Sequence, residues 1–184
     1  LLNKRHRLTL MFHTAVNEVT LTQQTLEKLP EIELEQVADS ESWGGKSKVR
    51  FARGFKLSLG QLQLDDVSIF RSIHSCHQTD GKFGPRQLQS QIIEVDFDRS
   101  KLLMHSELPE RTSDWELVEI TIKNVMMLVD GGIHVGGDGV QKRFMIHSGY
   151  SVFALLDDEF VAKHENINDM EIIDESELTD SSGN

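Results

Sequence analysis

The sequence predicts a mostly β fold with a few short helices. Three observations support this prediction. Apolar stretches of strand length recur along the chain, and turn residues separate them. Helix signals are few. Two segments, one near each end of the chain, share the same succession of a strand, a polar triplet, a loop and a helix. This repetition indicates that the chain has two related parts.

The first part begins with strands at Leu8–Phe12 and Val19–Thr22. A short helix follows over Thr22–Leu29, because Thr22 is a favourable N-cap and Pro30 ends the pattern. Five further strands are expected, at Ser47–Ala52, Phe55–Leu59, Gln61–Ile69, Gln91–Phe97 and Lys101–His105. Short strands at this spacing favour a barrel or a sandwich.

The polar residues Glu110–Asp114 predict a linker, so the domains are expected at 1–109 and 115–184 with 110–114 between them. The second part combines strands, a glycine-rich hairpin turn and one helix. Its expected elements are strands at Trp115–Leu128, Ile133–Val135 and Gln141–Ile146, a turn at Gly136–Gly139 and a helix at Leu155–Lys163. The tail from Glu165 is acidic, and this second domain looks incomplete.

Composition excludes two classes of protein. With 19 Lys and Arg against 30 Asp and Glu, the net charge of the 184-residue chain is −11. Nucleic-acid binding is not expected, because it needs clustered basic residues and the only dense cluster is Lys4–Arg7. A membrane span is excluded, since no apolar run approaches about 20 residues. Cys76 is the only cysteine, so no intrachain disulfide can form.

The repeat consists of the segments Leu8–Leu21 and Lys142–Leu155. In each, an apolar strand leads into a histidine, a small hydroxyl residue and a tiny residue. These triplets are His13-Thr14-Ala15 and His147-Ser148-Gly149. A few loop residues and a return to apolar character follow in both.

The triplets resemble the active-site loops of the pepsin and retropepsin superfamily, with His where the family has Asp. Other segments are similar to that family as well. Trp43-Gly44-Gly45 corresponds to the flap, Lys82–Leu88 to the hydrophobic-glycine segment that completes a ψ-shaped loop, and Gln91–His105 to the closing strand pair of bacterial aspartyl-protease-like proteins. The resemblance implies a bilobal acid-protease barrel fold with a pseudo-twofold axis between His13 and His147.

The resemblance also implies which residues form the site. His13, Thr14, His147 and Ser148 take the catalytic positions, and the cleft is expected to be lined by Ala15, Gly149, Trp43, Gly44, Gly45, Phe83 and Gly84. Aspartic peptidases work because two facing carboxylates share one proton and activate a water. Two buried imidazoles are neutral at neutral pH and supply no such negative charge. We therefore expect a catalytically inactive relative that binds peptide or protein in its interlobe cleft.

Alternatives remain open at this point. The two histidines could hold zinc or copper with a third ligand such as Glu18, or could support an unusual hydrolysis. A pure interaction scaffold is a further possibility. No cofactor is implied, and the compartment is undetermined, although the bacterial relatives suggest export.

Other clusters have simpler explanations. The segment Ile73–His77 contains possible metal ligands, but a metal site usually needs a second cluster of ligands elsewhere, and none is evident in the sequence. Gly131–Gly139 lacks the lysine of a phosphate-binding loop, so hairpin turns explain it better. Asp96 and Asp98 are expected to form a turn. No Gly-x-Ser-x-Gly motif supports a serine hydrolase, and His105 and His164 have no evident partner.

Overall fold

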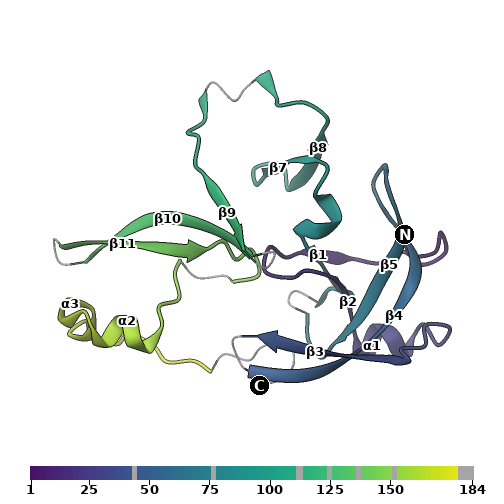
Figure 1. Cartoon of the computed structure of the whole chain (residues 1–184), viewed down its shortest axis with the longest axis horizontal. Helices are drawn as coiled ribbons and strands as arrows, with labels where there is room; N and C mark the ends of the chain where they lie inside the picture. Colours follow the sequence, from purple (N-terminus) through teal and green to yellow (C-terminus); the bar gives the residue numbers. More distant parts are fainter. Residues whose placement is uncertain are drawn as a thin grey trace.

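The computed structural model describes residues 1–42, 45–75, 78–110, 114–123, 126–135, 138–150 and 153–177. The protein is mostly β, as expected, and its strands form three sheets. We call residues 1–110 the N-terminal part and residues 114–177 the C-terminal part. Figure 1 shows the strands of the two parts on opposite sides of the molecule, with β1 (Leu10–Phe12) reaching toward the middle.

The N-terminal part is built on a six-stranded sheet with the order β1-β6-β2-β5-β4-β3. The remaining strands of this sheet are β2 (Val19–Thr22), β3 (Gln36–Ser42), β4 (Gly45–Leu59), β5 (Leu62–Ser72) and β6 (Gly81–Phe83). Strand β6 lies between β1 and β2, parallel to the first and antiparallel to the second. A late segment of this part therefore separates the two strands that flank the first histidine triplet.

Short elements complete the N-terminal part. Helix α1 (Gln23–Glu27) begins after Thr22, whose side chain accepts a hydrogen bond from the Thr25 amide, as the N-cap prediction requires. A 3-10 helix, η2 (Pro85–Leu88), follows β6. Strands β7 (Ile92–Asp96) and β8 (Lys101–His105) form a separate antiparallel hairpin.

The C-terminal part is an antiparallel sheet of β9 (Ile120–Lys123), β10 (Met126–Val135) and β11 (Asp138–Met145), followed by the helices α2 (Asp158–Ala162) and α3 (Glu165–Asn168). Strands β10 and β11 pair from Leu128↔Met145 to Val135↔Asp138 and form a hairpin, as expected. The expected turns at Gly131–Gly132 and at Asp138–Gly139 are wrong, because these residues pair within β10 and β11. The turn residues Gly136 and Gly137 themselves lie outside the described residues.

Several boundaries differ from those expected. The strands Ser47–Ala52 and Phe55–Leu59 are one strand, because β4 continues through a register shift near Gly54, which has a φ of +86°. The segment Trp115–Leu128 is not one strand, since β9 begins only at Ile120. Helix α2 starts at Asp158, where the Asp157 carboxylate caps it by accepting from the Phe160 amide.

The expected closed barrel is wrong for the described residues. Each of the three sheets has two free edge strands, such as β1 and β3 in the largest one. Within the residues that the structure describes, no helix is both long and apolar enough to cross a bilayer.

The buried core is concentrated in the N-terminal part. Leu2, Leu21, Leu57 and Ile69 are at most 2% exposed and pack between the sheet and its loops. In the C-terminal part, by contrast, Leu117 and Phe153 are almost fully exposed, and Phe160 is the buried apolar residue. The hydrophobic effect therefore stabilises the N-terminal part more than the C-terminal part.

Candidate functional site

Two loops from different parts of the chain meet beside β1. The first follows β1 and carries His13, Thr14 and Ala15. The second follows β11 and carries His147, Ser148 and Gly149. We call residues 12–15 together with residues 146–149 the seam, because four hydrogen bonds and one ring contact between described residues join the two parts here.

The hydrogen bonds of the seam are reciprocal. The Thr14 hydroxyl donates to the Ile146 carbonyl (2.6 Å) and accepts from the Ser148 amide (2.9 Å). In the mirrored arrangement, the Ser148 hydroxyl donates to the Phe12 carbonyl (2.9 Å) and accepts from the Thr14 amide (3.0 Å). Each hydroxyl thus uses both its donor and an acceptor site on the opposite loop, which gives the seam local twofold symmetry.

The two imidazoles lie side by side at this junction. The ring centroids of His13 and His147 are 4.6 Å apart, and the ring planes make an angle of 68°. Gly149 makes this approach possible, because a Cβ atom at that position would lie 2.3 Å from His13 Nε2. His13 Nδ1 accepts a hydrogen bond from the Ala15 amide at 3.2 Å, so a neutral His13 carries its proton on Nε2.

Burial and positive neighbours keep both rings neutral. Burial, then His147, then Lys82 lower the pKa of His13 to about 4. Burial and Lys82 also lower the pKa of His147. Sequence reasoning missed the role of Lys82, which lies in β6 and is only 6% exposed. The resemblance included Lys82 in the segment that completes the ψ-shaped loop but gave this side chain no role.

This arrangement defines the chemistry that the seam can support. At neutral pH it presents two neutral imidazoles and a nearby lysine, and no carboxylate of the described residues is among the groups that shift the pKa of either ring. General-base activation of water by a shared-proton carboxylate pair is therefore absent from the seam. A single neutral imidazole could accept a proton, but the resulting charge would be opposed by burial and by Lys82.

The depressed pKa of His13 predicts acid-sensitive stability. Since the unfolded chain binds a proton near pH 6.5 and the folded chain only near pH 4, the free energy of unfolding should fall as the pH drops between these values. We expect a loss of about 2 kcal/mol from His13 by about pH 5. Urea unfolding at neutral and acidic pH should show a smaller loss in His13→Asn, whose amide oxygen can still accept from Ala15. An equal loss in variant and wild type would contradict this cause, and the exposed His74→Asn serves as the control.

The other expected site residues are only partly brought to the seam. Phe83 is buried at the end of β6, and its carbonyl accepts from the His13 amide at 2.9 Å. Gly84 is packed against the loop after β1, since a Cβ there would lie 1.5 Å from the Val16 carbonyl oxygen. Gly45 begins β4, with a φ of +120°. Trp43 and Gly44 lie outside the described residues.

The metal alternative gains no support from the arrangement. Among the described residues, no group of three His, Cys, Asp or Glu side chains is arranged to hold an ion. Glu18, the suggested third ligand, instead pairs with Arg86. Cys76 and His77 lie outside the described residues.

The remaining candidate residues have local partners. Asp96 accepts from the Arg99 amide in the turn between β7 and β8, as a turn-forming residue would. His105 contacts the buried Glu94 at 2.8 Å, a partner that the sequence did not reveal. His164 Nδ1 lies 2.7 Å from the Phe160 carbonyl. Each contact therefore stabilises a local turn, hairpin or helix end.

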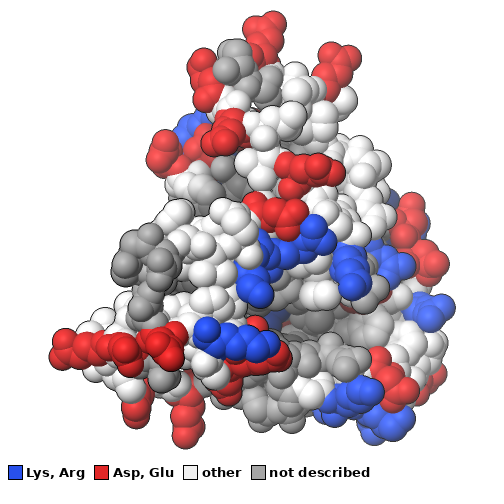
Figure 2. Space-filling model, turned by 60° about the vertical axis from the view of Figure 1, so that its left-hand side comes forward, with Lys and Arg blue, Asp and Glu red and all other residues white. Residues whose placement is uncertain are grey.

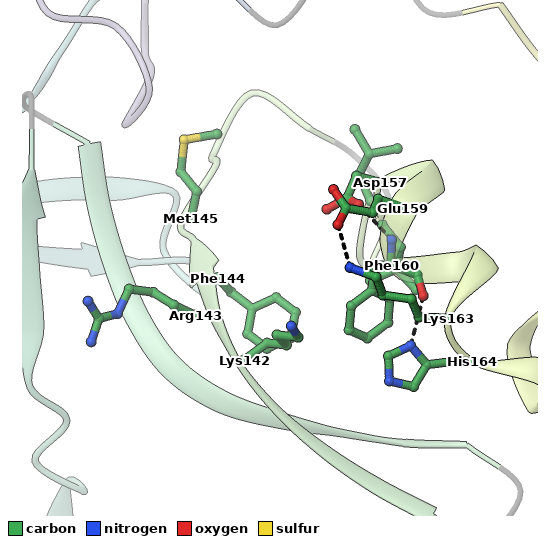
Figure 3. Close-up of a pocket in the computed structure, with 11 residues that line it drawn as sticks. Lys142, Arg143, Phe144, Met145, Asp157, Glu159, Phe160, Lys163 and His164 are labelled. Atoms are coloured by element: carbon green, nitrogen blue, oxygen red, sulfur yellow. Dashed lines mark hydrogen bonds and ion pairs between the residues drawn. The ribbon is translucent and has the colours of Figure 1, made fainter.

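A separate hollow of about 290 Å³ lies in the C-terminal part between β11 and the segment around α2 (Figure 3). Its charged side chains already have partners: Lys163 pairs with Glu159, and Arg143 pairs with Asp130 on β10. Lys142 lies 5.4 Å above the Phe160 ring. Neither histidine of the seam lines this hollow.

Charged side chains are unevenly distributed over one face of the protein (Figure 2). Figure 2 shows Lys and Arg side chains in a band across the middle of one face, with Asp and Glu side chains above and below it. Comparison with protein-family models, curated proteins and solved structures found no significant match.

Proposed function

We propose that this chain is an aspartyl-protease-like protein of the bilobal acid-protease type that binds peptide and does not cleave it. In this proposal His13 and His147 replace the two catalytic carboxylates. The groove between the lobes, above the seam, holds the peptide.

The reciprocal hydrogen bonding of Thr14 and Ser148 carries the proposal. The two loops are equivalent, because each uses a hydroxyl to bond to the backbone of the other. This arrangement fits a site built around a pair of side chains related by twofold symmetry. That pair here is His13 and His147, whose rings are in contact. Chance pairing of two surface loops would not be expected to produce matched donors and acceptors.

The path of the N-terminal part gives a second line of support. Strand β6 runs between β1 and β2, and the residue after it, Gly84, packs against the loop after His13. This agrees with the likeness of Lys82–Leu88 to the segment that completes a ψ-shaped loop around the first catalytic position.

The chemistry supports binding over catalysis. The seam retains the hydroxyl groups that position His13 and His147, but its residues include no carboxylate. The negative charge that activates water in an aspartic peptidase is therefore absent from the seam. Among the described strands, β3 (Gln36–Ser42) lies at an edge of its sheet, where an extended peptide could add main-chain hydrogen bonds.

A library of mixed-sequence peptides tests the proposal. We expect some peptides to stay bound to the wild-type protein during size-exclusion chromatography and to be recovered uncleaved at acidic and at neutral pH, with or without zinc. The variant His13→Asp/His147→Asp restores two facing carboxylates and is expected to cleave peptides of the bound set at acidic pH.

Two results would contradict the proposal. One is cleavage by the wild type that disappears in His13→Ala or His147→Ala, which would make the histidine pair catalytic. The other is the absence of any retained peptide from a folded wild-type protein, which would favour an interaction scaffold without a peptide groove.

A further inference from the structure

The junction between the two parts is narrow. Among the described helices and strands, every extensively packed pair belongs to one part, such as β4 with β5 or β10 with β11. The seam supplies the described hydrogen bonds and ring contact that join the parts. A change confined to these few residues can therefore alter how the two parts associate.

A hydrogen bond to its own backbone favours a protonated His13, but burial, His147 and Lys82 outweigh it, so an added proton is disfavoured in the closed seam. The Nε2 atom of His13 already carries the hydrogen of the neutral ring, so protonation would occur on Nδ1. That atom accepts from the Ala15 amide at 3.2 Å, and a proton there would turn this acceptor into a second donor facing an N–H group. The hydrogen bond would be lost and the ring would have to move.

His147 has a related problem. Its Nδ1 atom is buried and has no hydrogen-bond partner among the described residues. A protonated imidazole has N–H groups on both ring nitrogens, so one of them would be buried without an acceptor. A backbone hydrogen bond favours protonation of His147, but burial opposes it more strongly, so the neutral ring is favoured on both sides of the seam.

The surroundings add repulsion. The groups that act electrostatically on His13 are His147, from the loop after β11, and Lys82, from β6, and Lys82 acts on His147 as well. The phenol ring of Tyr150 lies with its centroid 6.2 Å from that of His147. Among the described groups that face the rings, no carboxylate offsets a new positive charge.

We propose that His13 and His147 form an acid-sensitive latch, which holds the two parts together while both rings are neutral and releases them as the rings take up protons. This inference goes beyond the proposed binding function, since it concerns how the groove opens. It holds whether or not peptide occupies the groove.

Proton linkage gives the size of the effect. When a ring is freed into solvent, its pKa returns toward about 6.5. The ratio of open to closed molecules should then rise about tenfold for each pH unit below 6.5 for each ring that is released, down to the pKa of the closed form. For His13, whose closed-form pKa is about 4, the expected rise is about 40-fold between about pH 6.5 and pH 4.5, because half of the freed rings are already protonated at pH 6.5.

Paired spin labels can measure the opening directly. Gln89 and Thr121 are exposed and lie in different parts, so both can be replaced by labelled cysteines in a Cys76→Ser background. We expect the distance between the labels to be narrow at neutral pH and to become longer and broader near pH 4.5. Far-UV circular dichroism recorded at the same pH should still show the native strand content.

Matched variants decide whether the histidines are responsible. His13→Asn/His147→Asn keeps a hydrogen-bond acceptor near each Nδ1 position but does not titrate, so its label distance should stay short in acid. His74→Asn removes an exposed histidine away from the seam and should open like the wild type. If the double variant does not fold, His147→Asn alone should show reduced opening, because only one ring can then take up a proton.

The latch is overturned if the labelled wild type keeps its neutral-pH distance in acid while remaining folded. Such a result would indicate that the rings share a proton across the closed seam. It is equally overturned if the non-titrating double variant opens over the same pH range, since other titrating groups would then cause the opening.

Discussion

Replacing Gly84 by alanine is expected to lower the free energy of unfolding by about 3–5 kcal/mol. The backbone conformation is not the reason, because Gly84 is extended, with φ −116° and ψ −179°. The added Cβ would lie 1.5 Å from the Val16 carbonyl oxygen and 2.6 Å from its carbon. Because both contacts are to backbone, a side-chain rotation cannot relieve them.

The variant should also disturb the seam. The loop that carries Val16 begins at His13, whose amide donates to the Phe83 carbonyl next to Gly84. Moving this loop away from residue 84 would displace the first histidine from the second. We therefore expect the NMR resonances of both imidazoles to shift in Gly84→Ala, alongside the loss measured by urea unfolding.

Gly131→Ala is the matched control for this prediction. The nearest atom to a Cβ at that position is Phe144 Cδ2 at 3.6 Å, which is an ordinary van der Waals contact. Its effect on the free energy of unfolding should be within about 1 kcal/mol. If Gly84→Ala proved as mild as Gly131→Ala, the close approach of β6 to the loop after β1 would be incorrect.

The second large effect is expected for Thr14→Val. This change keeps the shape of the side chain but removes the hydroxyl that bonds to the Ile146 carbonyl and to the Ser148 amide. Thr14 is only 6% exposed, so water cannot easily replace these bonds. We expect the free energy of unfolding to fall by about 2–3 kcal/mol, since both partner groups lose their hydrogen bonds.

Thr20→Val is the control for the hydroxyl. The Thr20 hydroxyl is buried and has no hydrogen-bond partner among the described residues. Replacing it by a methyl group should leave the free energy of unfolding unchanged or raise it slightly. Denaturant unfolding of the two variants gives the comparison. Equal and small effects would mean that the seam hydrogen bonds contribute little to holding the parts together.

Local signals in the sequence were sufficient to predict those strands, caps and turns that depend on interactions between residues close together in the chain. Strand β2 has the predicted bounds, and Thr22 caps helix α1 as its hydroxyl predicts. Strand β8 also has the predicted bounds, because a turn at Asp96–Ser100 sets the hairpin register. The cap of α2 was available in the sequence too, since Asp157 precedes two further acidic residues.

Tertiary pairing explains what the sequence did not reveal. Strand β3 (Gln36–Ser42) was not predicted, because its polar residues show no alternation and its pairing with β4 stabilises it. The burial of Lys82 beside the two imidazoles results from the insertion of β6 between β1 and β2. The resemblance brought the segment Lys82–Leu88 to the first loop, but the direction of the Lys82 side chain depends on the register of β6, so the lysine could not be assigned to the site.

The seam joins positions 134 residues apart in the chain, whereas the hydrophobic core lies within residues 2–104. During synthesis, the nascent N-terminal part can thus bury its core before the second triplet has left the ribosome. Closing so long a loop is slow compared with pairing neighbouring strands. Docking of the parts should therefore be a late kinetic step. Until it occurs, His13 lies in the folded N-terminal part without contact to the imidazole of His147.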